Sequence, residues 1–246
     1  MSALKAKYYI SIFFITLMVI PAGCGKEVFR GPEVIERTEL APFTDINVNG
    51  IFDVQLSNAD TFLIQLTGHK NIIQNIDYTV NGYVLELSDG NPGQWMPDYP
   101  HVRLIIGFPD LQRITINSPS KVFSKDTIHS NSFSVRAYGL LTEIDIAINT
   151  ERFFLTTSYE DFGYYEIRGS TTNSEIRIYG SAQLHASDLY SEFAWIRNFS
   201  IGDCHVHVNR HLRALLGHYG NIYYYGSPEE ITIDRMESRG RLIRGD

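Results

Sequence analysis

The sequence predicts an all-β protein whose second half winds as a single-stranded β-solenoid, preceded by a part rich in β-hairpins. Segments of aromatic and β-branched residues alternate with turn residues, and no long amphipathic helical pattern follows residue 43. In the second half, glycines follow successive β-rich stretches at spacings of 24, 17, 22 and 18 residues. These glycines are Gly139, Gly163, Gly180, Gly202 and Gly220. A repeat of this length without helices indicates stacked coils, because one coil cannot bury its apolar face alone.

The unequal spacings leave a second architecture open. A β-sandwich with evenly spaced strands would also place turn residues after each β-rich stretch. A solenoid accommodates the same spacings only if loops of unequal length join its strands.

The first 23 residues have the features of a secretory signal peptide. Two lysines precede an apolar run at 8–20, which is shorter than the roughly 20 residues that a membrane-spanning helix needs. The sequence Ala22-Gly23-Cys24 resembles a lipobox, although Pro21 stands where an aliphatic residue is usual. We therefore expect residues 1–23 to be removed and Cys24 to carry a lipid that anchors the protein to the membrane. A plain signal peptide, with Cys24 an ordinary thiol, is the alternative.

The expected lipid on Cys24 divides the chain into a removed signal peptide, a tether and an exported domain. Residues 24–42 are charged and contain proline, so we expect a tether there, followed by one β domain at 43–246. A chain anchored in this way is expected in the cell envelope as an outer-membrane lipoprotein, facing either the periplasm or the surface. Cys24 and Cys204 are the only cysteines, so a lipid on Cys24 leaves Cys204 without a disulfide partner. We expect Cys204 to be buried, where a lone thiol behaves as a small apolar side chain.

The chain between residues 43 and 107 is expected to form strands and one tight hairpin. Apolar patterns predict strands at 46–48, 52–56, 62–66 and 102–107, and a short helical turn at 71–76. Asn81-Gly82 separates two β-rich stretches, 78–80 and 83–87, and is a strong hairpin signal. Turn residues between 89 and 100 predict a long loop.

Alternation along each strand predicts which side chains of the solenoid face outward. Counted from the glycines, the second and fourth positions are mostly apolar and include Cys204, so we expect them to face the core. The opposite positions are expected to form an outer ladder, in which His185 stacks on His207. The ring side chains expected in this ladder are His185, His205, His207, Tyr223 and Tyr225.

Three segments resemble the head GIN domain, a domain of unknown function for which an adhesin role has been inferred. They are residues 43–56, which read FTDINVNGIFDVQL, residues 71–82, and the closing GNIYYYGSP at 220–228. The resemblance implies a β-solenoid of the bacterial envelope without established catalytic residues. Between residues 163 and 217 the chain departs from the family pattern, because bulky side chains such as Tyr165 and Trp195 replace small ones.

Charge and motifs disfavour several classes of function. A formal net charge of -7 argues against nucleic acid, which is bound mainly through Lys and Arg at its phosphates, and against electrostatic docking on anionic lipid. No glycine-rich phosphate loop, nucleophile elbow or zinc-protease helix occurs, so no cofactor is expected. His205 and His207 share one side of a predicted strand, but a histidine pair without a carboxylate is weak support for a metal, and none is expected.

The outer ladder is therefore the expected binding surface. Tyrosine offers a broad apolar ring and a hydroxyl, which suit a glycan or protein ligand. Trp95 and Tyr99 in the long loop form a second candidate patch. The integrin tripeptide Arg244-Gly245-Asp246 is expected to be a coincidence.

Two other functions stay open. A carbohydrate-active enzyme on the same scaffold would need paired carboxylates around a glycosidic bond. Its candidates, Asp145, Glu166, Asp188 and Asp203, fall at different positions relative to the glycines and are not expected to converge. The other alternative is a passive scaffold, whose aromatic side chains pack under loops or cover the end of the solenoid.

Overall fold

A computed structural model describes residues 31–94, 96, 99–236 and 239–246. The expected signal peptide at 1–23 and Cys24 lie outside these residues. Within the described part, no helix is both long and apolar enough to cross a membrane.

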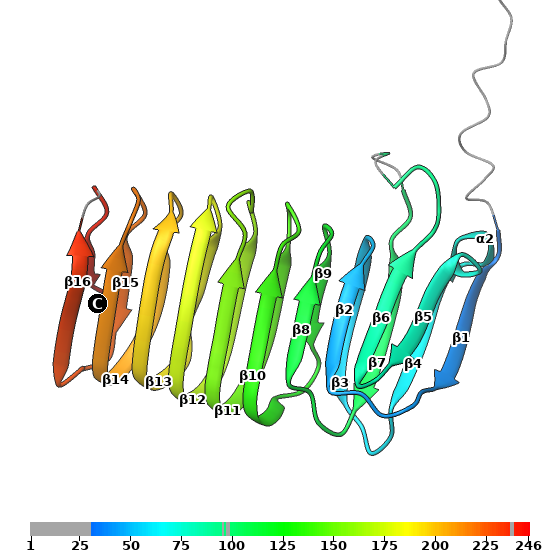
Figure 1. Cartoon of the computed structure of the whole chain (residues 1–246), viewed down its shortest axis with the longest axis horizontal. Coiled ribbons are helices and arrows are strands. Elements are labelled where there is room, and N and C mark those ends of the chain that lie inside the picture. The colour runs from blue at the N-terminus through cyan, green and yellow to red at the C-terminus, as the bar shows by residue number, and fades with distance from the viewer. Residues whose placement is uncertain (1–30, 95, 97–98, 237–238) are drawn as a thin grey trace, which may run out of the picture.

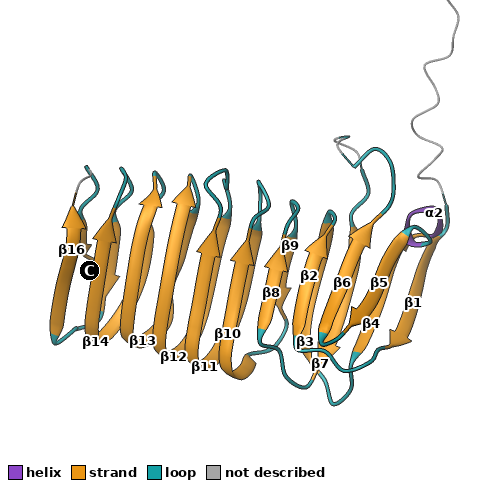
Figure 2. Ribbon diagram, viewed as in Figure 1, coloured by secondary structure: helices purple, strands orange, loops and turns teal. Residues whose placement is uncertain are grey.

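The strands lie side by side along the long axis of the molecule and wind as a β-solenoid of about 6 turns (Figure 1). The predicted fold class is thereby confirmed. One short helix interrupts the strands near the N-terminal end of the described chain (Figure 2). The N-terminal elements are β1 (Glu33–Glu39), β2 (Asp45–Asn49), β3 (Phe52–Asn58), β4 (Leu63–His69), α2 (Lys70–Ile73), β5 (Ile76–Asn81), β6 (Val84–Asp89) and β7 (Val102–Phe108). The remaining strands are β8 (Arg113–Ile116), β9 (Lys121–Ser124), β10 (Ile128–Ala137), β11 (Glu143–Thr157), β12 (Tyr164–Gly180), β13 (Gln183–Ser200), β14 (Cys204–Leu216), β15 (Ile222–Tyr225), β16 (Glu230–Met236) and β17 (Leu242–Arg244).

Each coil has two sides, and parallel pairing joins each side to the next coil. The start of β11 pairs with β9, whereas the rest of β11 pairs with β10. In the same way, the start of β14 pairs with β15 and its end pairs with β16. We call the starts of β11 to β14, with β3, β9, β15 and β17, the first side of the solenoid. The ends of β10 to β14, with β2, β8 and β16, form the second side.

Antiparallel strands close the N-terminal end. β1 pairs antiparallel with β4, and β4 pairs antiparallel with β7. Residues 33–39, which the sequence analysis assigns to the tether, are therefore strand β1 in the structure. Most residues of this short strand are exposed, and its sequence does not alternate between apolar and polar residues as the other strands do. The sequence pattern therefore did not reveal it. Its exposed Glu33, Glu36 and Glu39 place charges on the outermost strand, which disfavours pairing with another chain.

The predicted hairpin is confirmed, with its turn displaced by one residue. β5 and β6 pair antiparallel from Asn81 opposite Val84, so Gly82 and Tyr83 form the turn. Gly82 has a φ of 62°, which a residue without a Cβ adopts at little cost. The predicted helical turn is present as α2.

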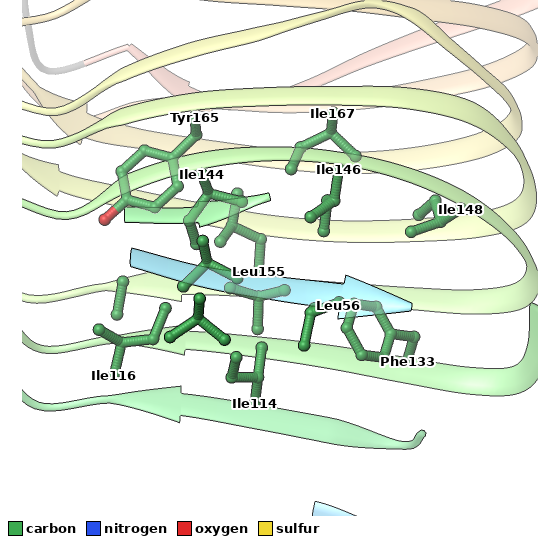
Figure 3. Packing of buried hydrophobic residues seen from close by; sticks show 14 of the residues in the cluster. Leu56, Ile114, Ile116, Phe133, Ile144, Ile146, Ile148, Leu155, Tyr165 and Ile167 are labelled. Carbon is green, nitrogen blue, oxygen red and sulfur yellow. The ribbon is translucent and has the colours of Figure 1, made fainter. Parts of the chain in front are cut away.

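Equivalent residues of successive coils form one buried column on the first side. Figure 3 shows two of its members, Ile144 and Tyr165, with other buried residues of the same core. Consecutive members are paired directly by the strand register, and each large apolar side chain contributes about 1.5–3 kcal/mol when fully buried. The column runs through Val54, Val122, Ile144, Tyr165, Leu184, Cys204 and Ile222. Cys204 is fully buried in it, as expected, and burial raises the pKa of its thiol.

Small residues stand two positions before this column, where the chain enters the first side. In the coils from Val122 to Ile222 those positions hold Ser120, Thr142, Gly163, Ala182, Gly202 and Gly220, and Gly240 stands two before Leu242, the partner of Ile222. Before Val54, near the N-terminal end, the position holds the larger Phe52. A Cβ at Gly202 would overlap the Ala182 carbonyl oxygen, and one at Gly220 would overlap the Gly202 carbonyl oxygen. Gly139 and Gly180 do not belong to this set, so the predicted repeat was right in its length but wrong in its register at these two glycines.

One polar pair lies within the apolar core. Tyr165 and Asp161 are both fully buried, and the Tyr165 hydroxyl donates a hydrogen bond to the Asp161 carboxylate. The Gly163 amide donates a second one at 2.8 Å. Burial raises the pKa of Asp161 to about 6, because desolvation of the charged form outweighs these hydrogen bonds. Asp161 thus satisfies the buried hydroxyl of Tyr165.

Candidate functional site

Three of the expected ladder residues form a continuous stack of rings on the first side. The register places His185 beside His205 and His205 beside Tyr223. The ring centroids of His185 and His205 lie 5.3 Å apart, those of His205 and Tyr223 lie 4.7 Å apart, and both pairs are within 7° of parallel. The rings are half-buried and project from the solenoid, because they alternate along the strands with core residues such as Cys204.

Two tyrosines extend this stack, which we call the His–Tyr column. The Tyr164 ring lies 4.7 Å from that of His185. At the other end, the Tyr225 hydroxyl forms a 3.1 Å hydrogen bond with Nδ1 of His205. The column therefore consists of Tyr164, His185, His205, Tyr223 and Tyr225.

His207 does not stack on His185, and this expectation was wrong. The corner residue of that coil is Ala182 and not Gly180, which places His185 opposite His205. His207 has another neighbour. Between Ala186 and Tyr190 the register of β13 shifts against β14, so that Tyr190 lies opposite His207. The two rings are 4.6 Å apart. An irregularity of this kind inserts residues into one strand only, and the glycine spacing could not reveal it.

A shallow hollow lies next to the column. Its volume is about 570 Å³, and His207 and Tyr225 are part of its wall. Asp188 and both charged residues of the C-terminal tripeptide, Arg244 and Asp246, line it as well. The hollow therefore combines aromatic rings with charged groups of both signs.

The electrostatic environment of His205 favours its neutral form. Partial burial lowers the pKa of His205, and the neighbouring His185 lowers it further, while Asp203 acts in the opposite direction. Two imidazoles at stacking distance repel each other when both are charged. The His205 ring at the centre of the column is therefore held in its neutral form at neutral pH.

Two of the four carboxylates considered for catalysis form ion pairs, and a third accepts a hydrogen bond. Asp145 and Glu166 do lie opposite each other on neighbouring coils, contrary to expectation. Arg168 sits between them, 2.6 Å from Asp145 and 2.7 Å from Glu166. Asp203 accepts a 2.7 Å hydrogen bond from the Asn221 amide. These contacts give the carboxylates a structural role in holding coils together.

The second candidate patch is not a surface patch as far as it is described. Tyr99 is 5% exposed, and its hydroxyl donates a 2.5 Å hydrogen bond to Asp89. Trp95 lies outside the described residues. Among the described residues, no three His, Cys, Asp or Glu side chains converge as metal ligands.

Sequence reasoning missed a second surface, which lies on the second side of the solenoid. There Phe193, Trp195 and Arg197 alternate with buried Ala194 and Ile196 along β13. The guanidinium carbons of Arg197 and Arg213 lie 3.6 and 4.5 Å from the centre of the Trp195 ring. The alternation of aromatic and charged residues at 193–197 was a signal for this surface, but the glycine alignment reached only the first side.

Comparison with known proteins identifies the family of the chain. A family model described as "Putative auto-transporter adhesin, head GIN domain" matches residues 42–228. The chain belongs to the head GIN domain family. No curated protein matches it.

Solved structures share the fold of this head GIN domain. A "putative adhesin" from Bacteroides fragilis is similar with a TM-score of 0.78 and 16% identity, over 87% of this chain and 97% of the other. Another from Parabacteroides distasonis has a TM-score of 0.68 and 17% identity, over 88% and 98%. A "putative lipid binding protein" from the same species has a TM-score of 0.65 and 15% identity, over 88% and 98%. At such identities the likeness shows the fold alone.

The lowered pKa of His205 predicts how the stability of the head GIN domain changes with pH. As the pH falls through about 6.5, the unfolded chain takes up a proton at this histidine before the folded protein does. The contribution of neutral His205 to the free energy of unfolding is therefore fully present above that pH and is lost as the pH falls below it. We expect the wild-type protein to lose more unfolding free energy between pH 8 and pH 5 than the His205→Gln variant, as measured by urea unfolding. An equal loss in both proteins would contradict this electrostatic picture.

Proposed function

We propose that this chain is a non-catalytic, adhesin-like protein of the cell envelope, anchored in the outer membrane by a lipid on Cys24, that binds a glycan through the His–Tyr column. The continuous stack of half-buried rings is the observation that carries the proposal. The row of stacked rings presents its edges to solvent, where the ring C–H groups can contact a sugar, and the imidazole nitrogens and tyrosine hydroxyls supply hydrogen bonds to sugar hydroxyls.

The rings are also held in place before any ligand binds. Each is fixed by its neighbour in the next coil, as the near-parallel His185, His205 and Tyr223 rings illustrate. Side chains ordered in advance lose little conformational entropy on binding. The adjacent hollow beside His207 and Tyr225 provides room for a branch or a following sugar.

A binding role also agrees with the state of the carboxylates. A glycosidase needs one carboxylic acid and one carboxylate on either side of the scissile bond. Arg168 instead bridges Asp145 and Glu166, so both carboxylates are engaged in ion pairs. The family description as an adhesin supports the same choice.

The proposed anchor predicts lipid labelling at one cysteine. Cells producing the full chain are grown with an alkyne analogue of palmitate, and the purified protein is assayed for the label. We expect the wild-type protein and the matched Cys204→Ala variant to be labelled and the Cys24→Ala variant to be unlabelled. Label on the Cys24→Ala variant would place the lipid elsewhere and remove the anchor from the proposal.

The proposed ligand surface predicts the loss of glycan binding in a double variant. Removing the rings of His205 and Tyr223 interrupts the stack at its centre, so we expect affinity for glycans bound on an array to fall at least tenfold. The control is His218→Ala/Tyr219→Ala, which removes another His–Tyr pair, 4.8 Å apart and exposed, outside the column. Glycan binding must survive in this control.

Three results would contradict the proposal. Absence of wild-type binding to any glycan on the array would favour a protein ligand or a passive scaffold. Unchanged affinity of His205→Ala/Tyr223→Ala would place the site elsewhere. Release of reducing ends from a bound glycan would show that the protein is an enzyme.

A further inference from the structure

A long groove crosses the second side of the solenoid, away from the His–Tyr column. Two hollows, with volumes of about 410 and 530 Å³, share Phe154 and Glu175 in their walls and are therefore adjacent. Together they extend over β8 and the ends of β10 to β14, which at about 4.8 Å per strand is roughly 24 Å. This length fits a chain of sugars or a similar linear polymer better than a single small molecule.

Positive charge is concentrated along this groove in a protein that is acidic overall. Among the residues that line the two hollows, Glu175 is the only acidic one. The arginines that line them are Arg113, Arg136, Arg152, Arg177 and Arg213. The whole chain has a formal net charge of -7, so this local excess of arginine favours an anionic partner at the groove.

The charge on the groove floor is only partly neutralised. Glu175 pairs with Arg177 at 2.6 Å and also with Arg197, so one carboxylate serves two guanidinium groups. Arg136 and Arg152 are exposed, and neither pairs with a carboxylate among the described residues. Both are therefore available to a ligand at no loss of an internal ion pair.

Aromatic side chains alternate with these charges. Phe154 and Phe193 are 37% and 38% exposed, and both line the groove. Trp195 lies opposite Arg213 in the strand register, and the guanidinium groups of Arg197 and Arg213 contact its ring. Both groups already pair with carboxylates, Arg197 with Glu175 and Arg213 with Asp234 at 2.7 Å, as Arg113 does with Asp45 at 2.8 Å.

Arg136 and Arg152, which hold no ion pair within the described part of the chain, are therefore the ones suited to bidentate pairing with a carboxylate or sulfate of the ligand.

We propose that this Arg–aromatic groove binds an acidic polysaccharide. The arginines pair with the anionic groups of successive sugars, while Phe154 and Phe193 contact the apolar faces of the sugar rings. The groove is a second site, on a different side of the coil from the His–Tyr column, and does not depend on the function proposed for that column. A single-stranded nucleic acid offers similar chemistry, but its binding depends mainly on a large number of Lys and Arg contacts to phosphate, and this chain is acidic overall.

The test compares charged and uncharged ligands on the full chain. Polygalacturonate, alginate and heparin are titrated into the protein by calorimetry, together with fully methyl-esterified polygalacturonate and a single-stranded DNA of similar length. We expect at least one acidic polysaccharide to bind, and to bind at least tenfold more tightly than both the esterified polymer and the DNA. Raising sodium chloride from 50 to 500 mM should weaken the binding.

Matched variants locate the site. Arg136→Gln/Arg152→Gln removes two groove charges that hold no internal ion pair, so we expect it to fold normally and to bind at least tenfold more weakly. The control Arg37→Gln/Arg103→Gln removes the same charge from exposed positions on β1 and β7 and should bind like the wild type. The His205→Ala/Tyr223→Ala variant should also keep this binding, so a failure of one site is distinguishable from a failure of the other.

Several outcomes would overturn the proposal. These are no binding of any of the three acidic polysaccharides, equal binding of the esterified polymer, DNA binding as tight as that of the polysaccharides, and wild-type affinity in Arg136→Gln/Arg152→Gln. Equal weakening in the control pair would show that net charge alone, and not the groove, controls the affinity.

Discussion

The close, in-register stacking of parallel coils is the constraint on which the rest of this structure depends. Each residue lies about 4.8 Å from its equivalent in the next coil, so the choice made at one position is imposed on a whole column. Inside, this gives the apolar column in which Tyr165, Leu184 and Cys204 follow one another. At the corner of the C-terminal coils it favours small residues, because the backbone carbonyl of one coil occupies the place of a Cβ at Gly202 or Gly220.

The same spacing shapes the two outer surfaces. Like rings placed one above another can stack, as His185, His205 and Tyr223 do. Like charges placed one above another repel, so Asp145 and Glu166 require Arg168 between them. On the second side the ring of Trp195 attracts two neighbouring guanidinium groups by cation–π contact. An aromatic surface and an arginine-lined groove thus arise from one repeating backbone.

The sequence reveals the features that depend on local pattern and misses those that depend on register. The solenoid, the hairpin at Gly82 and the burial of Cys204 follow from alternation, turn chemistry and a repeat near 20 residues. The pairing of His185 was wrong, because the corner position of that coil is Ala182 and the glycine beside it, Gly180, belongs to the preceding turn. Alanine can occupy the corner position as glycine does, so a search for glycines alone does not find every corner.

Other features could not be predicted because partners distant in sequence create them. Strand β1 has little apolar alternation, and it forms because β4 offers an edge with which it pairs. Tyr99 lies in a predicted loop and was expected to be exposed, yet its side chain is buried and its hydroxyl donates a hydrogen bond to Asp89. The side chains that line the Arg–aromatic groove come from β8 and from β10 to β14, and no single segment of the sequence contributes more than a third of them.

The most direct test of this winding is the reactivity of the Cys204 thiol toward a bulky disulfide reagent in a Cys24→Ala background. Cys204 lies in the buried column, between Leu184 and Ile222 of the neighbouring coils. If the coils stack in this register, the thiol stays unmodified in the native protein and reacts fully in denaturant. Rapid, complete modification under native conditions would show that Cys204 faces water, and neither the core column nor the surfaces opposite it could then be arranged as described.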